Sequence, residues 1–221
     1  MKPAFLILFS FISVVAFGQE VLKTLIEPHD SGRIREARFK AEAKNKRKLF
    51  RKEGEWMEYL NNWGEISKDT NSPYYMLCNY HNGKLSGIGR IYDEFTGKLF
   101  LEVPYDENGK ETGTERQYYE SGKIEYERQY LKGKRNGTLK GYYENGNLEV
   151  EGHWANGEEN GIEKGYYENG NLKIESPVVN SKKDGVEKEY FENGKLKSEK
   201  LFRNDTLQEQ KNYDENGNEI K

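Results

Sequence analysis

The sequence predicts an all-β protein: an elongated single-sheet meander of tandem antiparallel β-hairpin repeats, preceded by an N-terminal signal segment. Two observations support this fold class. From Gly113 onward, glycines and tyrosines recur at intervals of 24 residues, and each interval holds an Asn-Gly or Ser-Gly dipeptide between two short runs of alternating apolar and polar residues. Self-similarity at a fixed period of this length is the signature of a repeat array, and such dipeptides mark tight hairpin turns.

The first 18 residues predict export. Lys2 precedes an apolar run over 3–17 that is short for a membrane span, and the small residues Ala16 and Gly18 stand at its end. These features are typical of a secretory signal. We therefore expect cleavage after Gly18 and a location in the periplasm, at the cell surface or outside the cell, with an uncleaved N-terminal anchor as the alternative.

The composition suits a thin sheet that is held together without disulfides. Only 34% of the residues are hydrophobic and 33% are charged, yet the chain has 16 tyrosines and 10 phenylalanines, whereas disordered chains are poor in aromatic residues. Cys78 is the single cysteine and lies in an apolar run. We expect it to be a buried strand residue rather than a reactive thiol, because no basic side chain close to it in the sequence would lower its pKa.

The repeats divide the chain into five parts. Residues 1–18 form the signal segment, and 19–53 hold a divergent first hairpin and a basic linker. Irregular hairpin repeats follow over 54–112, regular 24-residue repeats over 113–208, and a truncated C-terminal cap repeat over 209–221. An atypical terminal unit is common in repeat arrays.

The linker is the one strongly basic part of the chain. Residues 33–52 carry ten Lys or Arg against two Glu, whereas the repeats after them are net acidic. We expect a solvated connecting segment here. Docking of 33–52 on an acidic partner, or its peripheral contact with anionic lipid head groups at a membrane, is the less favoured alternative.

Each regular repeat has the pattern of a hairpin with a two-residue type I′ turn, because Asn-Gly readily supplies the two positive φ angles that this turn requires. The predicted structural turn residues are Gly122, Gly146, Gly170 and Gly194. A turn at 145–146 places Lys140 opposite Glu151. The same rule gives an opposite-charge pair at this level in the other three repeats, namely Arg116 with Glu127, Lys164 with Glu175, and Lys188 with Glu199. Each pair contributes only about 0.2–1 kcal/mol, so its main effect is to fix the register.

The same register assigns the side chains to two faces, since they alternate along a strand. The predicted packed face pairs Tyr119 with Ile124, Tyr143 with Leu148, Tyr167 with Leu172, and Phe191 with Leu196. The opposite face carries the charged pairs and an exposed tyrosine ladder, and it is the candidate binding surface. Its residues are Tyr118, Tyr142, Tyr166, Tyr190, Lys140, Lys164 and Lys188. A ladder that serves only to stabilise neighbouring strands is the other interpretation.

No set of residues predicts catalysis, a metal site or a cofactor. His29, His81 and His153 are scattered, with no spacing that suggests metal ligands or a catalytic base. The segments 106–109 and 214–217 lack the alternating ligands of a calcium loop. Binding of nucleic acid needs a basic face, whereas the repeats are acidic. We therefore expect a protein that is not an enzyme and that has no cofactor and no nucleic-acid partner.

The segment Tyr-Tyr-Glu-Asn-Gly-Asn-Leu, at 142–148 and 166–172, resembles the MORN-repeat variant family, and the resemblance extends over about 54–221. It implies an elongated, twisted hairpin meander that makes contacts with proteins or phospholipids. Many bacterial members are named antitoxin-like, which implies the antitoxin or immunity partner of a toxin. An exported chain could have that role only if the toxin acts outside the inner membrane.

These observations favour an exported, non-catalytic repeat scaffold that binds a protein partner in the cell envelope. Two alternatives stay open. One is a module that binds envelope glycans by stacking the tyrosine ladder on sugar rings, and the other is the antitoxin or immunity protein of a toxin–antitoxin system.

Overall fold

The computed structural model describes residues 25–28, 34–37 and 52–220, and these residues form strands and turns without a helix. They fall into two units that divide at residues 50 and 51. In the first unit, β1 (Leu25–Pro28) pairs antiparallel with β2 (Ile34–Ala37). The predicted signal segment, the turn between β1 and β2, and most of the basic linker lie outside the described residues.

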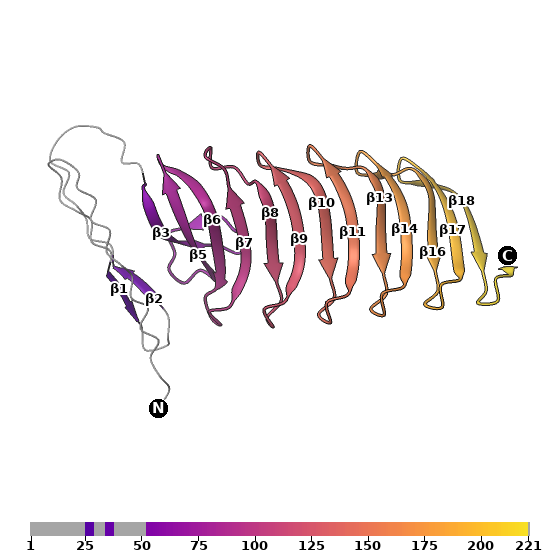
Figure 1. The fold of residues 1–221 in the computed structure, drawn as a ribbon, viewed down its shortest axis with the longest axis horizontal. Helices are drawn as coiled ribbons and strands as arrows, with labels where there is room; N and C mark the ends of the chain where they lie inside the picture. Colours follow the sequence, from indigo (N-terminus) through magenta and orange to yellow (C-terminus); the bar gives the residue numbers. More distant parts are fainter. Residues whose placement is uncertain (1–24, 29–33, 38–51, 221) are drawn as a thin grey trace, which may run out of the picture. The chain divides into compact units, whose positions relative to one another are not determined.

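The second unit is one antiparallel sheet of 17 strands that follow one another in chain order (Figure 1). No pairing between described residues joins the last strand to the first, so the sheet is open, and the predicted all-β meander is confirmed. The strands are β3 (Gly54–Leu60), β4 (Ile66–Ser67), β5 (Tyr74–His81), β6 (Lys84–Asp93), β7 (Leu99–Tyr105), β8 (Gly113–Tyr118), β9 (Ile124–Leu131), β10 (Lys134–Tyr142), β11 (Leu148–Ala155), β12 (Glu158–Glu159), β13 (Gly161–Tyr166), β14 (Leu172–Val179), β15 (Lys182–Lys183), β16 (Gly185–Tyr190), β17 (Leu196–Arg203), β18 (Thr206–Tyr213) and β19 (Glu219–Ile220).

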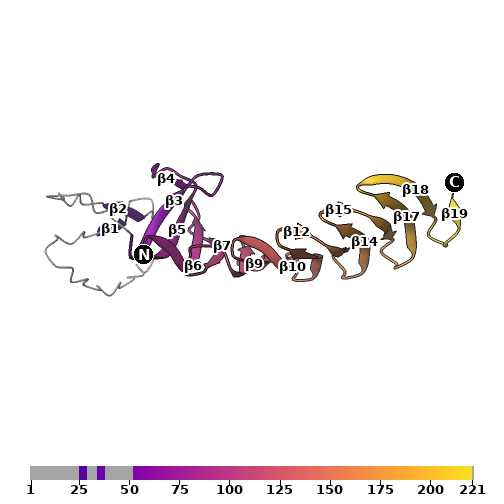
Figure 2. The same cartoon turned by 90° about the horizontal axis from the view of Figure 1, so that it is seen from above.

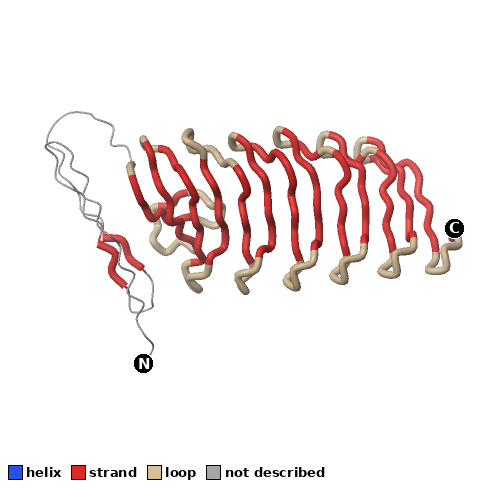
Figure 3. The backbone as a smooth tube through the Cα atoms, in the orientation of Figure 1, coloured by secondary structure: helices blue, strands red, loops and turns tan. Residues whose placement is uncertain are grey.

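This sheet is a single layer. Figure 2 looks along the strands and shows the strands of the second unit bent and side by side in one layer. The turns lie along the two long edges of the sheet (Figure 3), so both faces of the layer are formed by strand side chains. The described residues contain no helix with the length and hydrophobicity needed to cross a bilayer.

The turns at the Asn-Gly dipeptides differ from the prediction. The amide of Gly146 donates to the carbonyl of Tyr143 at 2.8 Å, and the amide of Tyr143 donates to the carbonyl of Asn147 at 2.9 Å. Gly146 has a φ of 94°, whereas the φ of Asn145 is not positive. The loop therefore has three residues, a type I turn followed by a left-handed glycine, and the predicted two-residue type I′ turn was wrong.

A β-bulge next to this turn explains which predicted pairs occur. Tyr142 lies opposite Leu148, but Gly141 lies opposite Val150, so one extra residue is inserted between Leu148 and Val150. Beyond this bulge the register is the predicted one, and Lys140 lies opposite Glu151. The predicted partners of Ile124, Leu148, Leu172 and Leu196 were wrong by one residue, because these side chains lie opposite Tyr118, Tyr142, Tyr166 and Tyr190 instead.

The type I′ turns lie at the other edge of the sheet, in the connections between hairpins. Asn156 and Gly157 have φ angles of 54° and 95° and form a two-residue loop between Ala155 and Glu158. Positive φ also occurs at both central residues of the equivalent loops, Asn82-Gly83, Lys132-Gly133, Asn180-Ser181 and Asn204-Asp205. Successive loops are bonded together, as where the amide of Gly157 donates to the carbonyl of Arg135 at 2.8 Å.

One face of the sheet is packed around small residues. Along one level, Tyr126, Gly141, Val150, Gly165 and Ile174 lie opposite one another on consecutive paired strands. A Cβ at Gly141 would lie 2.7 Å from both Tyr126 and Val150, and one at Gly165 would lie 2.8 Å from Ile174. These glycines make room for the larger side chains beside them. We call this side of the sheet the packed face.

The most buried apolar cluster lies at the N-terminal end of the sheet. Its buried members are Leu60, Met76, Cys78 and Tyr80, and Trp56 packs against them. The Trp56 and Tyr80 rings meet edge to face, with 6.2 Å between centroids. Cys78 is 4% exposed, and burial raises its pKa to about 12. The prediction of a buried strand cysteine is confirmed.

Candidate functional site

A continuous row of alternating charge crosses the face opposite to the packed face. Each member lies directly opposite the next on the neighbouring strand, and six cations alternate with five carboxylates from β6 to β18. The row consists of Arg90, Glu102, Arg116, Glu127, Lys140, Glu151, Lys164, Glu175, Lys188, Glu199 and Lys211. We call this set the charge row. Its length follows from the meander, because every strand of the row pairs on both sides.

Close ion pairs occur at three places along the row. Arg90 Nε lies 2.8 Å from Glu102, and Arg116 Nε lies 3.0 Å from Glu127. Lys164 Nζ lies 4.0 Å from Glu151. No described carboxylate lies within ion-pair distance of Lys140 or Lys188. These two cations are therefore held beside carboxylates by strand register rather than by direct contact.

A row of tyrosines lies beside the charge row and bonds to it. Tyr166 donates its hydroxyl to Glu151, a residue of the preceding repeat, at 2.7 Å. The same bond occurs in every repeat, from Tyr118 to Glu102 at 2.8 Å, Tyr142 to Glu127 at 3.2 Å, Tyr190 to Glu175 at 2.8 Å, and Tyr213 to Glu199 at 3.2 Å. We call the two rows together the tyrosine–charge face.

These bonds leave the tyrosines half-buried rather than exposed as predicted. Burial, together with the hydrogen bond to the neighbouring carboxylate, raises the pKa of Tyr118, Tyr166 and Tyr190 to about 12. Burial also raises the pKa of Tyr142. The hydroxyls therefore stay protonated at neutral pH and act as donors to the glutamates.

A second tyrosine series, which the sequence predicted to lie on the packed face, ties the hairpin turns together. Tyr143 donates its hydroxyl to the carbonyl of Tyr166 at 2.7 Å, and Asn147 donates from Nδ2 to the carbonyl of Glu168 at 2.8 Å. Tyr119 and Tyr167 make the equivalent bond in their repeats. The recurring Tyr-Tyr pair was the feature of the sequence that could have indicated these bonds. The first tyrosine of each pair bonds to the preceding repeat, and the second bonds to the following one.

The packed face also carries charged groups, and these are enclosed. Glu115 and Arg128 form an ion pair at 2.9 Å, with 10% and 17% of their side chains exposed. Glu187 accepts hydrogen bonds from the Ser176 hydroxyl, at 2.6 Å, and from Lys183. Burial by itself would raise the pKa of Glu187, but these two bonds outweigh it, so the pKa lies below its usual value. Glu187 is thus held as a carboxylate inside the packed face.

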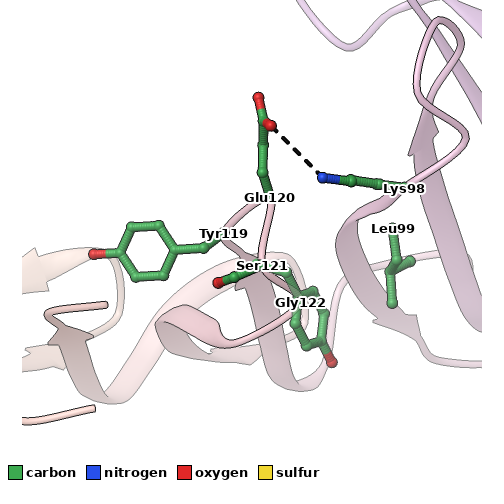
Figure 4. Close-up of a pocket in the computed structure, with 7 residues that line it drawn as sticks. Lys98, Leu99, Tyr119, Glu120, Ser121 and Gly122 are labelled. Carbon is green, nitrogen blue, oxygen red and sulfur yellow. Dashed lines mark ion pairs between the residues drawn. The ribbon is translucent and has the colours of Figure 1, made fainter. Parts of the chain in front are cut away.

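A pocket of about 310 Å³ lies at the hairpin-turn edge, where β7 meets the turn after β8. Figure 4 shows Lys98 and Glu120 pointing toward each other while the Tyr119 ring points away. The Lys98 and Glu120 groups are 3.7 Å apart and exposed. The pocket is lined mainly by turn residues, and its only charged groups pair with each other. It therefore does not bring together an acid, a base and a nucleophile.

The acidic turns at 106–109 and 214–217 have a structural explanation. Asp106 accepts the amides of Asn108 and Lys110 at 2.8 and 2.9 Å, and Asp214 accepts those of Asn216 and Asn218 at 2.9 Å each. These bonds satisfy the turn backbone. Within the described part of the chain, no three His, Cys, Asp or Glu residues are placed to hold a metal ion.

The structure brings all seven predicted binding residues onto the tyrosine–charge face. Gly122, Gly146, Gly170 and Gly194 all have positive φ and lie in the hairpin turns along one edge of the sheet. Sequence reasoning missed that the charge row is continuous between hairpins, and that it includes Arg90, Glu102 and Lys211. The recurrence of glutamate 13 residues before Lys140, Lys164 and Lys188 was the available signal.

Comparison with protein families identifies the repeats. The family of MORN repeat variants matches four tandem segments, at 111–132, 135–156, 159–180 and 183–204. Each segment starts near the beginning of one hairpin, passes through its Gly-containing turn and ends at the first residue of the loop to the next hairpin. The regular part of the sheet is a MORN-variant repeat array. No curated protein matches the chain. MORN repeats belong to a non-catalytic repeat family and generally mediate contacts with proteins or membrane lipids.

Proposed function

We propose that this MORN-variant protein is an exported, non-catalytic scaffold that binds a protein partner in the cell envelope through the tyrosine–charge face. The observation that carries the proposal is the uninterrupted charge row, which runs from Arg90 to Lys211 along an open face. Proteins that only need strand stability gain little from such pairs. A long, rigid and chemically regular surface is what a repeat scaffold offers to a partner.

The tyrosines support a protein partner more than an envelope glycan. Stacking on a sugar requires an accessible ring face, whereas Tyr142 and Tyr166 are half-buried and their hydroxyls are bonded to glutamates. Tyrosine and arginine are enriched at protein interfaces, and this face carries both. An immunity function against a secreted toxin would be one case of such binding.

Export is the part of the proposal that rests on the sequence of residues 1–18. It is tested by N-terminal sequencing of the protein recovered from the cell envelope. A mature chain that begins at Gln19 is expected, whereas a chain that begins at Met1 in the cytoplasm would contradict export.

The binding surface is tested by charge substitution and recovery of partners from an envelope extract. The triple variant Lys140→Gln, Lys164→Gln, Lys188→Gln should lose a partner that the wild-type protein retains. A matched control, Lys132→Gln, Lys134→Gln, Lys182→Gln, changes three exposed lysines outside the charge row. They lie in or beside the loops between hairpins, and their replacement alters the net charge equally. The control should retain the partner. Equal recovery by all three proteins would show that this face is not the binding surface.

A further inference from the structure

The charge row does not present its two signs equally to solvent. The exposed fractions of the Arg90, Arg116 and Lys164 side chains are 47%, 42% and 39%. Those of their partners Glu102, Glu127 and Glu151 are 18%, 27% and 27%. Each of these glutamates also accepts a tyrosine hydroxyl, so the tyrosine side chain covers part of the carboxylate.

The surface therefore displays a line of cations although the whole chain has a net charge of −3. The line comprises Arg90, Arg116, Lys140, Lys164, Lys188 and Lys211, which we call the cationic stripe. Its members occupy every second strand of the row. Neighbouring strands lie about 4.7–4.9 Å apart, so successive cations are about 9.5 Å apart and the stripe is roughly 45–50 Å long.

This spacing matches a particular conformation of a polypeptide. A polyproline II helix has three residues per turn and rises about 9.3 Å per turn. Every third side chain of such a segment points the same way, so acidic residues at every third position would meet successive cations. A β-strand fits less well, because its side chains alternate with a period of two and do not repeat on one side at this distance.

Building on the proposed function, we infer that the cationic stripe binds an extended acidic segment of the partner in polyproline II conformation, one three-residue turn to each 24-residue repeat. The two tyrosines of each repeat keep this surface rigid, since Tyr142 and Tyr143 each bond to an adjacent repeat. A preformed stripe and a preformed ligand helix both lower the ordering cost of binding.

The test uses two synthetic peptides of identical composition, charge and length. One is six repeats of Glu-Pro-Pro, and the other has six Glu followed by twelve Pro. Each exposed ion pair contributes about two- to five-fold in affinity, so the periodic peptide should bind at least about tenfold more tightly in fluorescence anisotropy titrations. Binding should weaken as salt rises, because exposed charges are screened.

The triple variant Lys140→Gln, Lys164→Gln, Lys188→Gln should reduce affinity for the periodic peptide by roughly 10- to 100-fold, as expected from three exposed ion pairs. The control Lys132→Gln, Lys134→Gln, Lys182→Gln should bind as the wild type does. Circular dichroism and urea unfolding establish that both variants keep the fold. Equal affinity for the two peptides, or an unaffected triple variant, would overturn the inference.

Vesicles of phosphatidylglycerol test the competing occupant. Stripe-dependent binding to these vesicles without binding to the periodic peptide would show that the stripe docks on a lipid surface, and would also overturn the inference. Failure of this inference is separable from failure of the proposed function. If the triple variant loses the envelope partner while neither peptide binds, the face is the binding surface but its ligand is not an acidic polyproline II segment.

Discussion

The hydroxyl of Tyr166 donates a hydrogen bond of 2.7 Å to Oε1 of Glu151, a residue of the preceding repeat. Glu151 also lies opposite both Lys140 and Lys164. Through side chains this carboxylate therefore links β11 to β13 and one repeat to the next, whereas Lys140 on β10 is held beside it by strand register. In a single-layer sheet, where few side chains are fully enclosed, such links between repeats add to the backbone pairing in holding the array together.

Removal of this hydroxyl should weaken the array. Tyr166→Phe leaves the ring in place and deletes one hydrogen bond, so the free energy of unfolding should fall by about 1 kcal/mol. Urea denaturation followed by circular dichroism measures the change. Tyr92→Phe is the matched control, because the Tyr92 hydroxyl has no hydrogen-bond partner among the described residues, although its ring stacks on Tyr75. Equal stability of the wild type and Tyr166→Phe would contradict the role given to the bond.

The raised pKa values of the tyrosines predict loss of stability at alkaline pH. Tyr118, Tyr166 and Tyr190 have pKa values of about 12 in the folded state, against about 10 in an unfolded chain. A pKa that is raised by folding gives stability that is complete below pH 10 and is lost as pH rises through 12. Urea midpoints should therefore fall over this range. A parallel absorbance titration should show these tyrosines ionising later than free tyrosine.

The limits of sequence reasoning on this chain have identifiable causes. The 24-residue period and the Lys140–Glu151 register could be predicted, because every regular repeat has the same hairpin pattern and therefore the same strand pairing. The turn type could not, because Asn-Gly suits both a two-residue loop and the glycine-ended three-residue loop found at Gly146. A single extra residue at the bulge then moves Leu148 to the opposite face.

For the candidate binding residues, the side of the sheet could be predicted but the exposure of the tyrosine rings could not. Alternation placed Tyr142 on the same side as Lys140, as the structure does. Whether the ring is exposed depends on Glu127, a residue of the preceding repeat, whose side-chain position is fixed by pairing between hairpins. A pattern read within one repeat does not contain that contact.

Two glutamates on the packed face should respond in opposite ways to replacement by glutamine. Burial and repulsion from Glu163 raise the pKa of Glu159, against the attraction of Arg135. The folded protein therefore favours protonated Glu159. The resulting stability is complete below the unfolded pKa, near 4.3, and is lost as pH rises through the folded pKa. At pH 7 the ionised side chain is unfavourable in the folded state. Glu159→Gln should raise stability at pH 7, and the gain should vanish near pH 4.

Glu187 has the opposite sign. Its lowered pKa gives stability that is present above pH 4–5 and is lost as pH falls through the folded pKa. Glu187→Gln should therefore destabilise the protein at pH 7, by about 1–3 kcal/mol for a bonded and buried group, and less in acid. Urea unfolding of both variants at pH 4 and pH 7 measures the two differences. The same sign of effect at pH 7 would contradict the assigned environments.

Gly141 should not tolerate a methyl group. An added Cβ would lie 2.7 Å from both Tyr126 and Val150, and overpacking of this kind costs about 1–3 kcal/mol. Gly141→Ala should therefore lower the urea midpoint. The double variant with Val150→Ala tests the cause, because removal of one clashing side chain should make its loss smaller than the sum of the two single losses. Strictly additive losses would rule out the contact as the source.

Lys132 is a position where substitution should stabilise the array. It has a φ of 53° in its type I′ loop, a conformation that asparagine adopts at the equivalent positions Asn82, Asn156, Asn180 and Asn204. A left-handed backbone is strained for lysine and much less so for asparagine, whose short polar side chain bonds locally. Lys132→Asn should therefore raise the free energy of unfolding by about 0.5–1 kcal/mol. Lys132→Gln removes the same charge without relieving the strain, and it should leave stability unchanged. If both variants are equally stabilised, the gain comes from the loss of charge and not from the backbone.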